Sequence, residues 1–263
     1  KFTPEFSKEF FATPVKAVPT ENRPLAEGQS VDELIAPLSQ VIFDPSVMAK
    51  RVNQAEGQDL ILTSANNLYE GVTQKEVENY YNKLKNPKDP TPISYGLNTK
   101  VVKQNGKIVE LPYKVDGLYS DAIKKIVYWL KKAEEVAENE AQKNHIGKLI
   151  SYYESGDLKT FDEYSILWAQ DTISQVDFIN GFIESYGDPL GMKGAWESLV
   201  NFKNMDASHR TEIISENAQW FEDNSPVDSK FKKESVKGVS AKVITAAILA
   251  GDCYPSTPIG INL

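Results

Sequence analysis

The stretch that decides the fold is Gln175–Phe202, which reads QVDFINGFIESYGDPLGMKGAWESLVNF. Apolar and polar residues alternate over Gln175–Tyr186, and a period of two is typical of a half-buried β-strand. The turn sequence Asp188-Pro189-Leu190-Gly191 follows, and Gly194–Phe202 can return as a partner strand. Gly181 interrupts the first strand, which indicates a bulge or a close approach by another segment. We therefore expect an antiparallel strand pair here.

Two other segments favour strands. Asn105-Gly106 stands between β-branched runs within residues 101–111. This dipeptide predicts a hairpin, because both central residues of a type I′ turn need a positive φ. The apolar run Val239–Leu249 favours a buried strand, and residues 253–263 suit an extended chain.

Helical signals dominate the rest of the chain. The first 30 residues are rich in proline and are expected to form an irregular arm. Apolar spacing and capping boxes predict helices over residues 31–40, 45–53, 73–85, 120–143, 146–153, from 160 through Trp168, and 206–221 with Asp206 as its cap. Together these elements predict an α+β fold with a helical excursion between strands.

Composition narrows the class of protein. The 263 residues are 41% hydrophobic, 10% aromatic and 25% charged, as in ordinary folded domains. The 29 basic and 37 acidic residues give a net charge of −8, which argues against a general nucleic-acid binder. No apolar run approaches the ~20 residues of a membrane span, so we expect no membrane partner.

The chain ends also carry information. The sequence begins at Lys1 without a signal segment and closes on the apolar stretch Ile259–Leu263. Natural C-termini are usually polar and frayed, so we expect a fragment of a longer protein. The compartment stays open between the cytoplasm, which is favoured, and the periplasm, because Cys253 cannot form an internal disulfide.

Few residues offer metal or nucleophile chemistry. His145 and His209 lack the spacing of a zinc-binding helix, so each is interpreted as structural or superficial. Cys253 has no histidine near it in sequence and is interpreted as a small buried hydrophobe. A nucleophile elbow and a glycine-rich phosphate loop are both absent from the sequence, so we expect no nucleotide cofactor.

A group of acids is the strongest functional candidate. Glu184, Tyr186 and Asp188 alternate along one extended segment, so they are expected to share a strand face. Glu197 follows on the return strand, where a hairpin would bring it near them. The group is either a solvated face or a ligand site. A ligand site could hold a cation such as a peptide amino terminus, or act as a two-carboxylate hydrolase through Glu184 and Glu197.

Four ordered motifs resemble one family. Gly181–Pro189 is similar to the Gly-x-x-Glu-x-Tyr-x-Asp-Pro signature of dipeptidyl peptidase III. Residues 168–171 (Trp-Ala-Gln-Asp), 194–197 (Gly-Ala-Trp-Glu) and 260–263 (Gly-Ile-Asn-Leu) resemble its other segments. The sequence of residues 186–192 resembles the bacterial members of that family most.

The resemblance implies a zinc-dependent exopeptidase that releases dipeptides from the free amino end of oligopeptides. It implies a β-barrel-like sheet, antiparallel or mixed and wrapped by helices, as the lower lobe of a two-lobed fold. The family's zinc motifs, His-Glu-x-x-Gly-His and Glu-Glu-x-x-Arg-Ala/Asp, do not occur in this sequence. We expect them beyond Leu263, with the metal-bearing lobe as a partner. The fragment itself is then expected to hold no catalytic zinc and to be inactive.

The resemblance also implies roles for single residues. Glu184 resembles the glutamate that receives the substrate ammonium, and Tyr186 resembles the tyrosine beside it that contacts the peptide backbone. Glu197 resembles a further acidic contact, and Asn262 an asparagine that hydrogen-bonds the peptide. Trp168 is interpreted as a packing residue.

The implied organisation has three parts. Residues 1–202 form a helical arm and a substrate-binding lobe, residues 203–235 a helical excursion toward the second lobe, and residues 236–263 the returning strands. The alternative from another functional class is a non-catalytic peptide-binding module that never had the metal lobe.

Overall fold

A computed structural model describes residues 3–238 and 242–254 of the protein, which form two compact units. Unit 1 contains Lys1–Pro92, Thr99–Leu111 and Tyr186–Lys193. Unit 2 contains Ile93–Asn98, Pro112–Ser185 and Gly194–Leu263. Both units are therefore assembled from segments that are distant in the sequence.

The sheet of unit 1 is built around the expected hairpin. It has the order β1-β2-β3, with β1 (Tyr69–Glu70) parallel to β2 (Thr99–Gln104), and β3 (Lys107–Pro112) next to β2. Asn105 and Gly106 join β2 to β3 with φ values of 49° and 76°. Two successive positive φ angles are those of a type I′ turn, so the hairpin prediction is confirmed.

The helices of unit 1 differ partly from expectation. α3 (Gln74–Leu84) starts at the predicted capping box of Thr73 and Glu76. α2 (Val31–Phe43) confirms the helix expected over residues 31–40, and it starts at a capping box of Ser30 and Glu33 that was not predicted. The prediction of an irregular arm over the first 30 residues is wrong. Ser7 caps the helix α1 (Lys8–Ala17), and Thr20–Asn22 forms a 3₁₀ turn. A helix over residues 45–53 is also wrong, because Asp44 binds the Ser46 amide at 2.8 Å and Met48 takes a φ of 48°.

The hairpin turn allows a direct test of this backbone geometry. Replacing Gly106 by alanine is expected to destabilise unit 1 by about 1–2 kcal/mol, because a Cβ is unfavourable at this left-handed φ. Replacing Asn105 by glycine should change the free energy of unfolding by less than about 0.5 kcal/mol, since glycine accepts the same conformation. Amide hydrogen exchange of β2 and β3 measures both effects. Equal protection in the two variants would contradict the turn assignment.

Three helices form the core of unit 2. They are α4 (Ser120–Glu135), α5 (Glu140–Ser155) and α6 (Leu158–Gln170). Their inner faces supply most of one buried cluster, which includes Val127, Leu149, Tyr152, Tyr153 and Phe161. The prediction that the first helix continues to residue 143 is wrong. α4 ends at Glu135, and Asn139 caps α5 by accepting a hydrogen bond from the Gln142 amide at 2.9 Å. Asp157, and not Thr160, caps α6.

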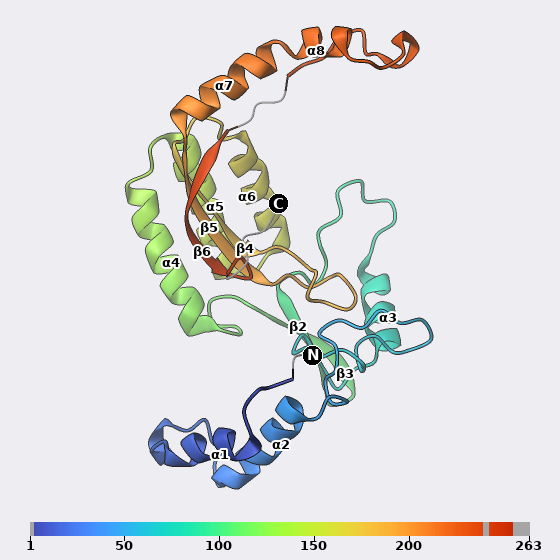
Figure 1. The fold of residues 1–263 in the computed structure, drawn as a ribbon, viewed down its shortest axis with the longest axis vertical. Helices are drawn as coiled ribbons and strands as arrows, with labels where there is room; N and C mark the ends of the chain where they lie inside the picture. The colour runs from blue at the N-terminus through green and yellow to red at the C-terminus, as the bar shows by residue number, and fades with distance from the viewer. Residues whose placement is uncertain (1–2, 239–241, 255–263) are drawn as a thin grey trace. The chain divides into compact units, whose positions relative to one another are not determined.

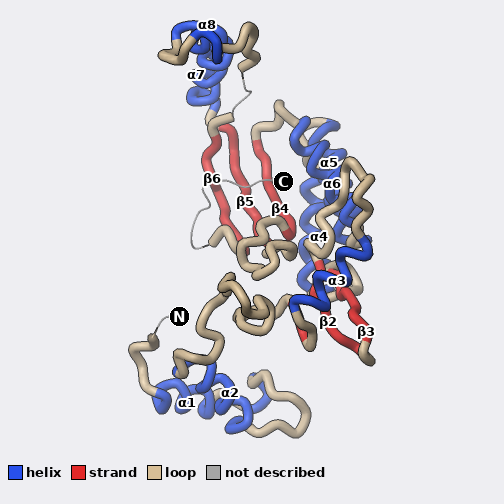
Figure 2. Tube along the Cα trace, turned by 90° about the vertical axis from the view of Figure 1, so that its right-hand side faces the viewer, coloured by secondary structure: helices blue, strands red, loops and turns tan. Residues whose placement is uncertain are grey.

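A second sheet lies against these helices (Figures 1 and 2). Its order is β4 (Val176–Phe182), β5 (Trp196–Lys203) and β6 (Ile244–Gly251), with antiparallel pairing throughout. Phe178 and Phe182 of β4 pack against the helical cluster. The strand pair predicted from Gln175–Phe202 is therefore confirmed.

Two details of this sheet correct the strand expectations. The close approach at Gly181 is confirmed, since a Cβ there would lie 3.0 Å from the Phe161 ring, but Gly181 pairs regularly with Glu197 and is not itself bulged. The register is irregular instead between Val200 and Asn201, opposite β6. The strand expected within Val239–Leu249 is confirmed as β6, although residues 239–241 lie outside the described residues. Its expected burial is wrong, because β6 borders only β5 among the described strands and Ile248 is 61% exposed.

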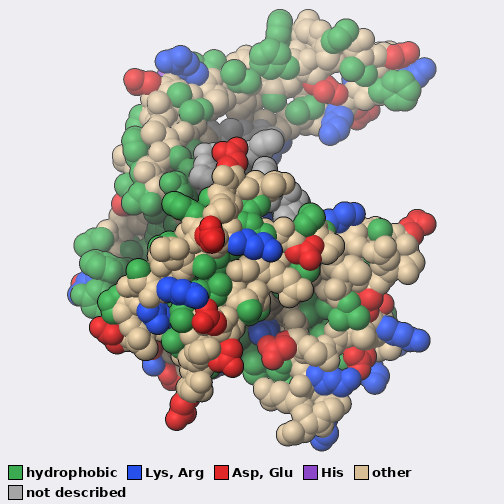
Figure 3. Space-filling model, turned by 60° about the horizontal axis from the view of Figure 1, so that its bottom comes forward, with side chains coloured by type: hydrophobic (Ala, Val, Ile, Leu, Met, Phe, Trp, Pro, Cys, Tyr) green, Lys and Arg blue, Asp and Glu red, His purple; other side chains and the backbone are tan. Residues whose placement is uncertain are grey.

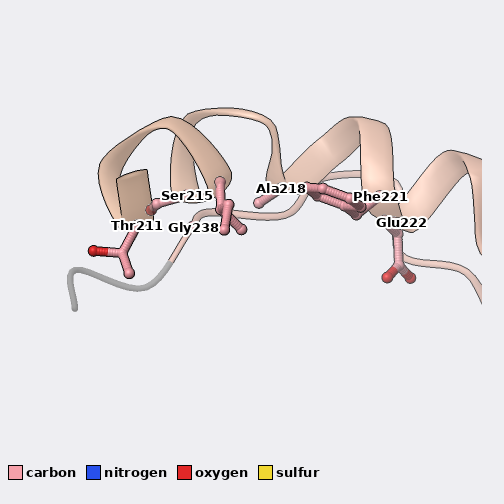
Figure 4. A pocket seen from close by; sticks show the side chains of 7 residues that line it. Thr211, Ser215, Ala218, Phe221, Glu222 and Gly238 are labelled. Atoms are coloured by element: carbon pink, nitrogen blue, oxygen red, sulfur yellow. The ribbon is translucent and has the colours of Figure 1, made fainter. Parts of the chain in front are cut away.

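The excursion between β5 and β6 is helical, as the sequence predicts. It contains α7 (Met205–Glu216), α8 (Ala218–Asn224) and a 3₁₀ turn at Ser229–Phe231. Asn204 rather than Asp206 caps α7, and Asn217 separates α7 from α8. A pocket of about 430 Å³ opens beside them and is lined by residues that include Ser215, Ala218, Phe221 and Gly238 (Figure 4).

The architecture confirms the α+β class. The described residues form two open three-stranded sheets, and they show no closed barrel. No helix in the described ranges combines the length and apolar character needed to cross a membrane. Acidic and basic side chains intermingle on the face drawn in Figure 3.

Candidate functional site

The site is built where β4 runs past its last regular pair. Phe182 pairs with Trp196 in the ladder. Beyond it, the Ile183 amide donates to the Ala195 carbonyl at 3.1 Å, and the Ala195 amide donates to the Glu184 carbonyl at 2.9 Å. One residue on the β5 side therefore faces two on the β4 side, which is the pattern of a β-bulge.

The bulge decides which way Glu184 points. Glu197 pairs with Gly181, so Glu184 would lie on the opposite sheet face if the register continued unbroken. One extra residue reverses the alternation and brings Glu184 to the side of Glu197. The two carboxylates are close enough for Glu184 to raise the pKa of Glu197 by repulsion, in addition to the larger effect of burial.

Glu197 is almost completely buried. Its side chain belongs to a residue that is 2% exposed, and its Oε2 accepts a hydrogen bond from the Cys253 thiol at 3.1 Å. Its other oxygen, Oε1, is buried without a hydrogen-bond partner among the described residues. Burial raises the pKa of this carboxyl above its usual range, while the thiol hydrogen bond opposes that shift.

Glu184 repeats this feature. The residue is half-buried, and its Oε1 is likewise enclosed without a hydrogen-bond partner in the described part of the chain. Buried polar atoms in folded proteins almost always have a hydrogen-bond partner, because an acceptor buried without one loses its hydrogen bonds to water and gains none from the protein. Two such oxygens from neighbouring acids make a site that favours a cationic hydrogen-bond donor.

Cys253 supports the acids instead of acting as a nucleophile. The residue is 0% exposed, so its interpretation as buried is confirmed. Burial, followed by the adjacent Glu197, raises the pKa of the thiol to about 12. The thiol is therefore protonated at neutral pH and donates to Glu197. No local sequence pattern indicates this contact, because 56 positions separate the two residues.

Asp188 lies in a different environment from the one expected. It belongs to a turn in unit 1, where its carboxylate accepts from the Tyr69 hydroxyl at 2.9 Å and from the amides of Met192 and Lys193 at 2.8 Å. The expectation that Asp188 shares a strand face with Glu184 is wrong, because β4 ends at Phe182. The carboxylate oxygens of Asp188 instead accept hydrogen bonds within the turn. Tyr186 starts this turn segment and is 79% exposed.

The buried position of Lys193 was not predicted from the sequence. It is 1% exposed, and its Nζ donates to the Tyr81 hydroxyl at 2.9 Å and to Thr99 Oγ1 at 3.0 Å. Both hydroxyls in turn donate to Glu110. Burial lowers the pKa of Lys193 to about 8, against the attraction of Glu110 and Asp188. No local signal marks this lysine, since its partners lie far away in the sequence.

The histidines and Trp168 have structural positions. His145 is 1% exposed, with Nε2 3.4 Å from Asp171 Oδ2, and burial lowers its pKa. The His209 side chain is 73% exposed and lies 3.6 Å from Glu212. Trp168 packs against the core and donates to Asp177 at 3.0 Å. Asn262 lies outside the described residues.

The described residues do not fit a zinc centre. Within residues 3–238 and 242–254, no group of three or more histidine, cysteine, aspartate or glutamate side chains could hold a metal ion. Glu184, Glu197 and Cys253 do not make up such a group.

Known proteins resemble the chain in sequence and in fold. Dipeptidyl peptidase 3 of Dictyostelium discoideum is 34% identical over 157 residues, and the human protein of that name is 29% identical over 153 residues. These matches cover 57% and 58% of this chain. The structure of DPP III from Caldithrix abyssi covers 94% of this chain with a TM-score of 0.59 and 20% identity.

The matches extend over only part of the relatives. The chain spans 22% of the Dictyostelium protein and 20% of the human one, and 44% of the Caldithrix abyssi chain. The model of peptidase family M49 matches residues 94–263, which is more than half of the chain. The resemblance drawn from the four motifs is therefore confirmed, and the chain belongs to peptidase family M49.

Proposed function

We propose that Glu184 and Glu197 bind the protonated amino terminus of an oligopeptide. The observation that carries this proposal is the pair of buried carboxylate oxygens, one from each residue, that lack hydrogen-bond partners within the described residues. A protonated amine supplies several donors and a positive charge, and it would satisfy both oxygens at once.

The chain is then the peptide-anchoring part of a zinc-dependent dipeptidyl aminopeptidase. Family membership supports a peptidase, and relatives named dipeptidyl peptidase 3 support release of dipeptides. Such an enzyme must hold the free amine at a fixed distance from the bond that it cleaves, so a rigid anchor is part of the chemistry. The bulge and the Cys253 hydrogen bond hold the two acids in place.

The remaining roles extend this proposal. Tyr186, which is exposed, and Asn262 would contact the peptide backbone beside the anchored amine. Zinc would be bound by residues of the parent protein outside this chain, whose sequence has neither family zinc motif. The apolar side chains exposed on α7 and α8, such as Ile214 and Trp220, would contact the metal-bearing lobe.

The test is the binding of a tetra-alanine peptide to this chain by isothermal titration calorimetry. The free-amine peptide should bind about 10- to 100-fold more tightly than its N-acetylated form, because a hydrogen bond to a charged group contributes roughly 1.5–3 kcal/mol. The control is tetra-alanine with a free amino terminus and an amidated C-terminus, and it should bind as tightly as the unmodified peptide. Equal affinity for the acetylated and free-amine peptides would overturn the proposal.

A further inference from the structure

A second pocket lies within unit 2 and has no part in the anchor described above. Its volume is about 310 Å³, at the small end of the roughly 300–1,000 Å³ usual for ligand pockets. Its polar lining comes from Ser94, Asp162 and Ser165. Leu97, Phe161, Ile166 and Ile183 form its apolar wall.

Asp162 is the charged group of this pocket, and it differs from its acidic neighbours. Asp157 caps α6 by accepting the amides of Lys159 and Thr160, and Glu163 pairs with Lys148 at 2.6 Å. The carboxylate of Asp162 makes no hydrogen bond and no ion pair within the described residues, although the residue is half-buried. Burial and the nearby Asp157 both raise its pKa, and no cation offsets them.

The Ser165 hydroxyl, which lines the pocket together with Asp162, is available as an acceptor. Ser165 donates its own hydroxyl hydrogen to the Phe161 carbonyl at 2.9 Å, so its oxygen keeps free lone pairs. An anionic carboxylate and an accepting oxygen both complement a ligand with several N–H donors. They do not complement an anion or a simple apolar molecule.

The apolar wall is firmly supported. Phe161 is 5% exposed and belongs to the helical core, and Leu97 and Ile183 pack against that core. Leu97 is also fixed at its backbone, because its carbonyl accepts the Gly194 amide at 2.8 Å. The wall can therefore hold a short aliphatic stem without rearrangement, which keeps the entropic cost of binding low.

We propose that this pocket binds a protonated amine or guanidinium on a short aliphatic stem, with the cation at Asp162 and the stem against Leu97, Phe161 and Ile183. The ligand has two possible sources with the same chemistry. One is a lysine or arginine side chain of a bound peptide, and the other is a free small organic cation. The site goes beyond the amine anchor, because it shares neither Glu184 nor Glu197.

The probes are n-butylguanidinium as the free cation and N-acetyl-Ala-Arg-Ala-amide as the side-chain form. The acetyl group prevents the peptide from using the amine anchor. N-butylurea, which has similar shape and no charge, is the neutral control. Binding is followed by ¹⁵N chemical shifts, and the amides of Leu97, Ser165 and Ile183 should move for the charged probes alone.

Three variants separate this pocket from its surroundings. Asp162→Asn should weaken binding of the charged probes at least about tenfold, since it removes the one charge among the described lining residues. Glu163→Gln removes one charge at the next position, and Glu184→Gln removes one from the anchor. Both should leave the dissociation constant within about twofold. Ile166→Arg, at a residue that is 58% exposed, should place its own cation near Asp162 and block both probes.

The outcomes are distinct. Binding of the peptide alone assigns the pocket to basic side chains, and binding of n-butylguanidinium alone assigns it to free cations, and either supports the site. The proposal is overturned if neither charged probe binds at millimolar concentration, if N-butylurea binds equally well, or if Asp162→Asn and Ile166→Arg leave binding unchanged. Failure of the amine anchor is a separate result, because it appears as equal affinity of this chain for free-amine and N-acetylated tetra-alanine, which none of these probes measures.

Discussion

Replacing Glu197 by glutamine is expected to weaken binding of a free-amine peptide by about 10- to 100-fold. The change removes a negative charge that is buried at 2% exposure and keeps the shape of the side chain. It also leaves the Cys253 thiol with an oxygen to which it can still donate. The loss should therefore reflect the missing charge and not a collapsed site.

The pH dependence of peptide binding also tests the role of the Glu197 charge. Burial, followed by repulsion from Glu184, raises the pKa of Glu197, so this carboxyl takes up a proton as the pH falls and attracts the amine less. Peptide affinity should rise with pH as Glu197 ionises, and fall again as the peptide amine loses its proton near pH ~8. In Glu197→Gln the acid limb due to Glu197 should disappear, and the alkaline limb should remain.

Calorimetric titrations of free-amine and N-acetylated tetra-alanine across this pH range measure the effect. Asp252→Asn is the matched control, because Asp252 is exposed and also raises the pKa of Glu197. It should change affinity by less than about threefold, since exposed charges are screened. An equal loss for free-amine and acetylated peptides in Glu197→Gln would contradict the role of Glu197.

The largest loss of stability is expected for Asp188→Ala. This carboxylate is 2% exposed and accepts from the Tyr69 hydroxyl and from the amides of Leu190, Met192 and Lys193. Alanine leaves these donors unpaired and removes a negative charge near the buried Lys193 ammonium. We expect the free energy of unfolding of unit 1 to fall by about 3–5 kcal/mol.

Asp89→Ala is the matched control in the same unit. Asp89 also precedes a proline, but it accepts only the Thr91 amide, at 3.0 Å, among the hydrogen bonds of the described chain. Its replacement should cost less than about 1 kcal/mol. Urea unfolding followed by amide exchange in β2 and β3 compares the two variants. A loss in Asp188→Ala as small as that expected for the control, below about 1 kcal/mol, would show that the turn around Asp188 is not a stabilising element of unit 1.

Local chemistry explains what the sequence could predict. The Asn105-Gly106 turn and the capping box of α3 each depend on residues within a few positions of one another, and the β4–β5 pair joins two segments that follow each other along the chain. Such signals act before any tertiary contact forms. Where two local capping signals lie close together, the sequence does not decide between them: Asp157 caps α6 three residues before Thr160, the expected cap.

The acids of the site were identifiable for a different reason. Glu184 and Glu197 stand out because acidic residues beside Phe182 and Trp196 are costly to bury without partners. The residues that complete their surroundings were not identifiable. Cys253 reaches Glu197 only through the pairing of β5 with β6, and Lys193 reaches Thr99 across 94 positions. These contacts belong to the tertiary structure and leave no periodic trace in the sequence.

The bulge between Phe182 and Ala195 makes chain length part of the site. Because one extra residue turns Glu184 toward Glu197, deleting a single residue between Phe182 and Glu184 would keep both glutamates and still separate them. Mutagenesis by substitution alone cannot detect this requirement. Scanning this segment with one-residue deletions and insertions would reveal that the number of residues between the two acids matters as much as their identity.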